Sequence, residues 1–240
     1  MSARVLGRSG LPLLIVGGLD PLGASGVLAD VRALHGLAVW PLVVVSALTE
    51  QPHRVVAAPL FEASLRQALA QRPAAMKVGM LANAGQAHLV AELIGKIPLV
   101  LDPVLMASSG LRLYGSAPHT LQSLIAKAAL VTPNTSEAQA LHALLPDARA
   151  VLYKGGHGTG TRVTDTLRTA HAERHFTALR RPYSVRGTGC ALASRIAGEL
   201  ASGHALEKAV ARAERWLQRQ YKSARPASRR DILSPPQPRG

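Results

Sequence analysis

The sequence has few of the residues on which several classes of protein depend. Cys190 is the one cysteine among 240 residues, which excludes an intrachain disulfide and a cysteine-rich zinc module and is typical of a reducing compartment. Aromatic residues make up only 3% of the chain, whereas nucleic-acid binding by base stacking needs exposed aromatics among basic residues. No apolar run approaches the ~18 residues that span a bilayer. We therefore expect a cytoplasmic protein that binds neither membranes nor nucleic acids.

Acidic residues are also scarce, because 14 Asp and Glu stand against 28 Lys and Arg and give a formal net charge of +14. Such an excess favours an anionic partner, and a small anion satisfies it as well as a polymer does. An alternative is that the arginine content reflects the base composition of a genome. The charge alone therefore does not identify a ligand.

An apolar run at residues 11–18 follows Arg4 and Arg8, which is the outline of a secretory signal. The other interpretation is a first buried strand. Asp20 and Pro21 interrupt the run before any cleavage site, and this favours the strand.

Apolar runs typical of strands alternate along the chain with segments of helical periodicity. The predicted strands are 13–16, 39–48, 76–80, 98–101, 129–132 and 150–153, and the predicted helices are 25–35, 60–70, 87–94, 117–126, 134–144, 191–201 and 206–221. This pattern predicts an α/β fold in which helices cover both faces of a mainly parallel sheet. We expect a loop and a short antiparallel hairpin within 155–182, a single domain over 1–221, and a disordered, basic, proline-rich tail over 222–240.

Polar residues follow several of the predicted strands, and in a parallel sheet the ligand crevice lies at the carboxyl ends of the strands. Gly187-Thr188-Gly189-Cys190 opens a predicted helix and offers free backbone N–H groups to an anion. It is neither a Walker loop nor a dinucleotide fingerprint. At a helix start the thiol of Cys190 is expected to have a lowered pKa and to serve as a base or nucleophile. A buried structural cysteine is the alternative.

Two other types of site are not expected. His171 and His175 have the spacing of metal ligands on a helix, but they lie in the predicted hairpin and have no third ligand nearby. The chain also lacks a Gly-x-Ser-x-Gly nucleophile elbow, which argues against a hydrolase.

Six segments in order resemble the hydroxymethylpyrimidine/phosphomethylpyrimidine kinases of thiamine biosynthesis, which belong to the ribokinase-like superfamily. They are GGLDPLGASG at 17–26 with Asp30, KVGML at 77–81, LDPV at 101–104 with Ser109-Gly110, TPN at 132–134 with Glu137-Ala138, KGGH at 154–157, and GTGC at 187–190. The cysteine of the last segment favours this branch over the sugar kinases, most of which carry aspartate there. The resemblance extends over roughly residues 11–220.

The resemblance implies a three-layer α/β/α fold, a homodimer and a kinase that uses ATP and Mg²⁺. Its substrate would be 4-amino-5-hydroxymethyl-2-methylpyrimidine, the monophosphate of this aminopyrimidine, or both. Gly17, Asp30, Gln51 and Met80 would line the pyrimidine pocket, where Asp30 and Gln51 would hydrogen-bond the ring nitrogens and the amino group.

The remaining site residues would act on phosphate by the same resemblance. Asn134 and Glu137 would hold Mg²⁺ through water, Asp102 would lie near it, and Lys154 would neutralise nucleotide phosphate charge. The transferring phosphoryl group would bind at Gly187, Thr188, Gly189 and Cys190. Cys190 would either remove the hydroxyl proton or only orient the hydroxyl.

Several positions depart from the family pattern. Ser108 stands where lysine is frequent, and Arg186 replaces a histidine and would restore the lost positive charge. The segment between Gln51 and Met80 is short, which weakens a lid over the substrate, and a helix between 145 and 150 is missing. Two alternatives therefore stay open, a pyridoxal- or pyridoxine-type vitamin kinase of the same fold and a catalytically weakened regulatory binding protein.

Overall fold

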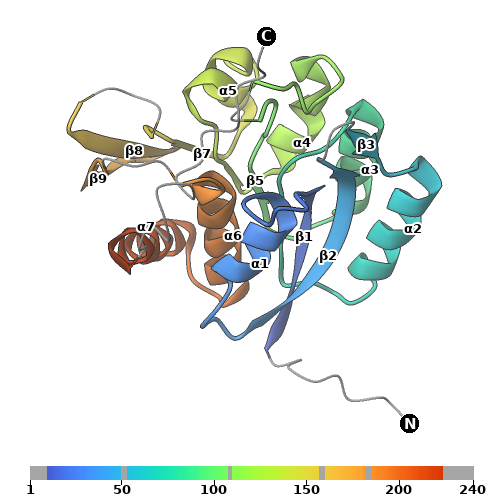
Figure 1. Ribbon diagram of the computed structural model, residues 1–240, viewed down its shortest axis with the longest axis horizontal. Coiled ribbons are helices and arrows are strands. Elements are labelled where there is room, and N and C mark those ends of the chain that lie inside the picture. Colours follow the sequence, from blue (N-terminus) through green and yellow to red (C-terminus); the bar gives the residue numbers. More distant parts are fainter. Residues whose placement is uncertain (1–9, 50–52, 108–109, 157–159, 182–184, 224–240) are drawn as a thin grey trace.

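The computed structural model describes residues 10–49, 53–107, 110–156, 160–181 and 185–223 (Figure 1). Its strands form one sheet in the order β3-β2-β1-β4-β5-β6-β7-β8-β9. The strands are β1 Leu11–Leu19, β2 Val39–Leu48, β3 Arg54–Val55, β4 Ala75–Val78, β5 Leu99–Leu101, β6 Leu130–Val131, β7 Ala150–Tyr153, β8 Arg162–Thr169 and β9 Glu173–Leu179. The α-helices are α1 Gly26–Ala33, α2 Ala58–Leu69, α3 Ala84–Leu93, α4 Gln122–Lys127, α5 Thr135–Ala140, α6 Thr188–Ala201 and α7 Leu206–Ser223, and short 3-10 helices span Pro118–Leu121 and Leu145–Asp147.

The six central strands, from β2 to β7, are parallel, whereas β3, β8 and β9 run antiparallel to their neighbours. The predicted mainly parallel sheet is thus confirmed. The hairpin of β8 and β9 is longer than expected, since seven residue pairs join its strands.

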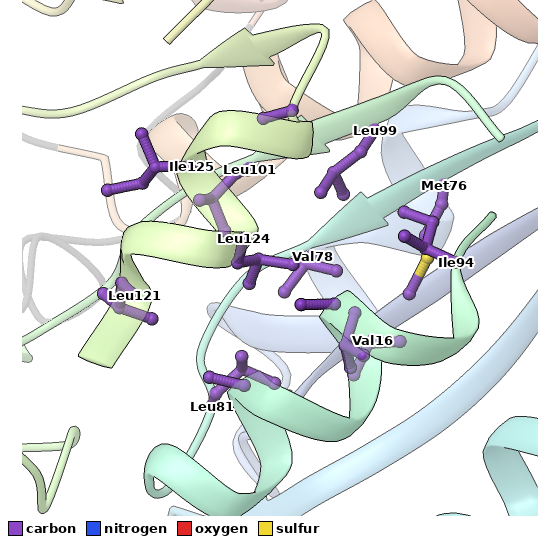
Figure 2. Close-up of a cluster of buried hydrophobic side chains, with 14 of the residues drawn as sticks. Val16, Met76, Val78, Leu81, Ile94, Leu99, Leu101, Leu121, Leu124 and Ile125 are labelled. Carbon is purple, nitrogen blue, oxygen red and sulfur yellow. The ribbon is translucent and has the colours of Figure 1, made fainter. Parts of the chain in front are cut away.

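Each face of the sheet is covered by its own set of helices (Figure 1). Alternate residues of β1 point to opposite faces, with Leu14 and Val16 in one apolar cluster and Leu13 and Ile15 in the other. The first cluster lies under α2, α3 and α4, and the second lies under α1, α6 and α7. Figure 2 shows part of the first cluster, in which strand residues such as Val78 meet helical residues such as Leu124. Burial on both faces explains why the central strands are apolar throughout.

The apolar run near the amino terminus is the strand β1, as preferred over the signal-like interpretation. Leu13 to Val16 are fully buried, and β1 pairs in parallel with β2 on one side and with β4 on the other. Because the chain leaves β1 toward β2 and later returns to β4 on the opposite side, a crevice opens at the carboxyl ends of β1 and β4. Within the described part of the chain, no helix combines the length and apolar character of a membrane span.

Several predicted boundaries differ from those in the structure. Helix α6 begins at Thr188 instead of residue 191, and α3 begins at Ala84 instead of residue 87. Helix α5 ends at Ala140 instead of residue 144, because Leu141 and Leu145 turn into the core and a 3-10 helix that contains Pro146 follows. Helix α7 continues to Ser223, two residues beyond its predicted end. Residues 224–240 of the predicted tail lie outside the described residues.

Candidate active site

A cavity of about 1710 Å³ opens at the carboxyl ends of the central strands. Loops that follow β1, β4, β5, β6 and β7 line it, together with the first turn of α6 and parts of β8, β9 and α7. The predicted site residues that line it are Gly17, Asp30, Met80, Asp102, Asn134, Glu137, Lys154, Gly187, Thr188, Gly189 and Cys190. Gln51 and Ser108 lie outside the described residues. Residues from distant parts of the sequence therefore meet in one cavity.

A nearly fully buried ion pair in the lining of this cavity joins Asp30 of α1 to Lys77 of β4. The Lys77 ammonium donates to both carboxylate oxygens at 3.0 and 2.9 Å, and the Ser194 hydroxyl donates to Oδ1 at 2.8 Å. The side chains of Asp30 and Lys77 are 0% and 1% exposed. Burial raises the pKa of Asp30, whereas the carboxylate more than reverses the lowering effect of burial on the pKa of Lys77. The three hydrogen bonds to the carboxylate favour its ionised form and oppose the effect of burial.

This pairing bears on the predicted role of Asp30. Both of its oxygens already accept hydrogen bonds from protein groups. The predicted hydrogen bonds from Asp30 to a pyrimidine would have to use the remaining lone pairs of these oxygens. The contact with substrate stays a prediction.

A second ion pair joins Asp102, which follows β5, to Lys154, which follows β7. Lys154 Nζ donates to Asp102 Oδ1 at 2.6 Å, and the Thr132 hydroxyl donates to the same oxygen at 3.2 Å. Although burial by itself raises the pKa of Asp102, the charges of Lys154 and Lys77 outweigh it and hold that pKa below its usual value. Lys154 is 13% exposed. The second pair is therefore the more open of the two.

Asn134 and Glu137 form a reciprocal cap at the start of α5. Glu137 N donates to Asn134 Oδ1 at 3.0 Å, and Asn134 N donates to Glu137 Oε2 at 2.8 Å. Glu137 is buried, and burial raises the pKa of its carboxyl to about 7, which Lys154 opposes and Asp102 reinforces. A buried carboxyl with a raised pKa is one that lacks a full counter-charge.

The oxygen donors of Asp102, Asn134 and Glu137 suit a hard cation such as Mg²⁺. No group of three His, Cys, Asp or Glu within the described ranges stands close enough to hold a metal by itself. This donor set fits a cation that keeps several waters and binds substrate phosphates, which is the usual state of Mg²⁺ in kinases.

The amino terminus of α6 forms the third part of the site. Gly187 has φ +77°, and a Cβ there would lie 2.3 Å from the carbonyl oxygen of Ala24, so glycine is required. The N–H groups of the next three residues have no acceptor within the helix. A Cβ on Gly189 would lie 3.2 Å from Lys154 Nζ, so the lysine lies directly beside this helix start. Backbone N–H groups, the helix dipole and a lysine thus converge on one point, which is suited to a phosphate.

The predicted lowering of the Cys190 thiol pKa was wrong. Burial raises this pKa to about 12, and the charge of Lys77 does not compensate for the loss of water and for the carboxylates of Asp102 and Asp30. The side chain is partly exposed in the cavity wall. At neutral pH Cys190 is therefore a neutral thiol that can donate or accept a weak hydrogen bond.

Several cavity residues received no role from the sequence. Lys77 belongs to the KVGML segment without a predicted role, although a lysine inside a strand whose other residues are buried and apolar is a signal that could have found it. Asp165 of β8 and Glu214 of α7 gave no such signal, because their proximity depends on the tertiary fold. Arg186 lines the cavity, and its predicted role toward phosphate stays a prediction.

Comparisons with known proteins agree with this geometry. Residues 20–231 match the family described as Phosphomethylpyrimidine kinase. The hydroxymethylpyrimidine/phosphomethylpyrimidine kinase of Escherichia coli K12 is 33% identical, over 85% of this chain and 88% of the relative. The thiamine biosynthesis multifunctional protein ThiED of Corynebacterium efficiens is 29% identical over 88% of this chain, which spans only 33% of that longer protein. The fold is similar to that of the pyridoxal kinase from Staphylococcus aureus in complex with AMP-PCP and pyridoxal, with a TM-score of 0.80, 23% identity, and coverage of 94% of this chain and 92% of the other.

Proposed function

The chain belongs to the phosphomethylpyrimidine kinase family, and we propose that it phosphorylates 4-amino-5-hydroxymethyl-2-methylpyrimidine, the monophosphate of this pyrimidine, or both, with ATP as donor. The observation that carries the proposal is the position of Lys154 beside the start of α6, where a Cβ on Gly189 would lie 3.2 Å from Nζ. A lysine and a row of free N–H groups at one point stabilise the charge that spreads over a transferring phosphoryl group.

In this mechanism the substrate oxygen forms a bond to the γ-phosphorus while the bond to the bridging oxygen of ADP breaks. When the acceptor is the hydroxymethyl group, its proton passes to an oxygen of the transferred phosphoryl group or to water as the new bond forms; the monophosphate reacts through an ionised phosphate oxygen and loses no proton. Lys154 and the N–H groups of Thr188, Gly189 and Cys190 hold the phosphoryl oxygens. Because the thiol of Cys190 is neutral, its role is to orient the hydroxyl rather than to remove the proton as a thiolate. Positioning of this kind accounts for most of the catalysis in phosphoryl transfer.

Asp102, Asn134 and Glu137 would hold Mg²⁺, in part through water. When bound, Mg²⁺ neutralises phosphate charge. Lys154 keeps Asp102 ionised, whereas burial raises the pKa of Glu137 to about 7, so a bound cation would complete the ionisation of this carboxyl. The chain's own contribution is thus to hold Asp102 in the form that a divalent cation prefers.

The pyrimidine pocket would lie at the end of β1, over Gly17 and Gly18. A Cβ on Gly18 would lie 2.6 Å from the Met80 sulfur, and one on Gly17 would lie 3.4 Å from Val27. Glycine at these positions thus lets the side chains of Met80 and Val27 pack directly against the end of β1. Met80 supports the pyrimidine ring from the side, as a soft sulfur at a ring edge does.

We also propose that the chain works as one kinase domain over 1–221, in the cytoplasm and as a homodimer. The single cysteine supports the compartment. An edge of the sheet supports the dimer, because residues 39–45 of β2 pair only with β1 among the described residues and Val43 is 42% exposed. Long apolar edges of this kind are usually covered in native proteins. Light scattering after gel filtration tests the dimer, and a monomer at micromolar concentration would contradict it.

The kinase activity is tested by ADP release with Mg-ATP in four parallel reactions. These contain hydroxymethylpyrimidine, its monophosphate, pyridoxal, or no acceptor. Turnover with either pyrimidine supports the proposal and shows which phosphorylation occurs. Turnover with pyridoxal alone moves the protein to the vitamin-kinase alternative, and ATP binding without any turnover favours the regulatory one.

A further inference from the structure

Two buried carboxyls in the cavity wall have no role in the proposed chemistry. Asp165 lies on β8 and Glu214 lies on α7, and their exposed fractions are only 9% and 7%. Both line the cavity, and they lie close enough for their charges and side-chain oxygens to act on each other. Glu214 Oε1 is buried and has no hydrogen-bond partner among the described residues. No lysine or arginine in the described ranges forms an ion pair with either carboxyl.

A hydrogen bond between two carboxyl groups requires a proton, since an ionised carboxylate only accepts. Burial, then the charge of Asp165, raises the pKa of Glu214 to about 9, and burial also raises the pKa of Asp165. Two other groups act on the pair. The Gly155 N–H and Lys154 both lower the pKa of Asp165, and no cation acts on Glu214. The pair therefore carries one proton and one negative charge at neutral pH.

The same pair is connected to the phosphate-binding part of the site. Gly155 N donates to Asp165 Oδ1 at 2.8 Å, and a Cβ on Gly155 would lie 2.2 Å from the carbonyl oxygen of Thr164. On its other side the loop is fixed by Lys154, whose N donates to the carbonyl oxygen of Pro133 at 2.9 Å. Lys154 then reaches Asp102. One continuous series of contacts thus joins α7 to the lysine beside the anion hole.

We propose that Asp165 and Glu214 share one proton and act as a positioning pair, which fixes the backbone of Gly155 and hence Lys154 where the phosphates of the nucleotide bind. The nature of the ligand rests on the proposed function. When the shared proton is lost at alkaline pH, two buried negative charges face each other across β8 and α7. Their repulsion loosens the Gly155 loop, so nucleotide affinity falls.

The test compares Glu214→Gln with the wild type between pH 7 and pH 10. Glutamine keeps the size of the side chain and an N–H donor toward Asp165, but it does not titrate. Glu207→Gln is the matched control, because it removes the same charge from the same helix at a residue outside the cavity. Thermal unfolding without nucleotide and the KM for ATP are measured on the same preparations.

If the two carboxyls share a proton, the raised pKa of Glu214 determines how the stability of the folded state changes with pH. A carboxyl whose pKa is higher in the folded state loses its contribution to stability as pH rises through the folded value, here about 9. The melting temperature of the wild type and of Glu207→Gln should therefore fall more steeply up to pH 10 than that of Glu214→Gln. If the melting temperature falls equally with pH in all three proteins, the proposal that the two carboxyls share a proton is overturned.

For the positioning role, the KM for ATP of the wild type should rise roughly tenfold from pH 7 to pH 10 relative to Glu214→Gln, which corresponds to one lost hydrogen bond to a charged group. The kcat should change less than twofold. Equal KM ratios in the two proteins would overturn the positioning role even if the melting curves differ. If Glu214→Gln does not fold, Asp165→Asn provides the same comparison, because asparagine keeps the acceptor for Gly155.

Failure of the proposed function is recognised separately. Calorimetric titration of the wild type with Mg-ATP at pH 7 shows whether the nucleotide binds at all. Absence of binding overturns the proposed function and the positioning role together, whereas the melting curves still decide on the shared proton.

Discussion

The cavity contains two lysine–aspartate pairs that differ in their access to solvent. Asp30 and Lys77 are sealed between α1 and β4 at 0% and 1% exposure, and Ser194 adds a third group to them. Asp102 and Lys154 stand at the cavity wall, where Lys154 is 13% exposed and lies beside the start of α6.

A lysine–aspartate pair can therefore have either of two roles. It can stabilise the fold, or it can take part in ligand binding. Because the first pair is almost fully buried, the loss of one partner leaves an uncompensated buried charge. A pair at a cavity wall can exchange its partner for a phosphate at little cost. We therefore assign the first pair to the integrity of the fold and the second to phosphate binding.

The largest expected effect is on stability. Lys77→Met should lower the free energy of unfolding by about 3–5 kcal/mol, because it leaves the Asp30 carboxylate buried without its cation. Denaturant unfolding measures this change. The double variant Asp30→Asn/Lys77→Met should recover most of the loss. A Lys77→Met protein as stable as the wild type would show that the sealed pair is not a scaffold.

The second effect is on activity. Lys154→Met should lower kcat/KM for ATP by about 10²- to 10³-fold, as the loss of one preorganised charge does in other active sites. Its free energy of unfolding should fall by less than that of Lys77→Met, because Lys77 and the Thr132 hydroxyl still favour the ionised form of Asp102. A larger loss of stability than of activity would reverse the assignment of the two pairs.

The contrast between the pairs also marks what the sequence could predict. Runs of apolar residues predicted the strands, and the rule that ligands bind at strand carboxyl ends predicted that Asp102, Asn134 and Lys154 meet. These features depend on local pattern and sheet topology. The sealed pair does not, because Asp30 and Lys77 are 47 residues apart and nothing local shows that they touch.

The errors of prediction have the same origin. The expected lowering of the Cys190 pKa considered only the helix start, whereas burial and two carboxylates from other elements dominate. The early end of α5 depends on where Leu141 and Leu145 pack. In each case tertiary contacts outweighed a local rule.

A smaller effect on activity is expected from the substitution of Cys190, whose thiol lies near both ion pairs. Cys190→Ser should reduce kcat by less than about tenfold, because a hydroxyl can also orient the acceptor and no thiolate is needed at neutral pH. The pH profile of kcat should keep its shape. A loss above a thousandfold, or an alkaline rise that disappears in the variant, would indicate that a thiolate acts as the base.

The smallest effect is expected at Gly189, where a Cβ would lie 3.2 Å from Lys154 Nζ. Gly189→Ala should raise the KM for ATP by about two- to fivefold, since the flexible end of Lys154 must shift by a few tenths of an ångström. Alanine also favours a helix over glycine by up to about 1 kcal/mol. Thermal unfolding should therefore show no loss of stability, and a destabilised variant would contradict the assignment of the contact to ligand binding.

The most direct test of the two assignments is the shift in melting temperature that saturating Mg-ATP produces in Lys77→Met and Lys154→Met, measured against the wild type. A ligand stabilises the folded state only as far as it binds to it. The account predicts that Lys77→Met melts early but retains most of the shift, whereas Lys154→Met melts near the wild type and loses it. A Lys154→Met protein that keeps the full shift would contradict the account.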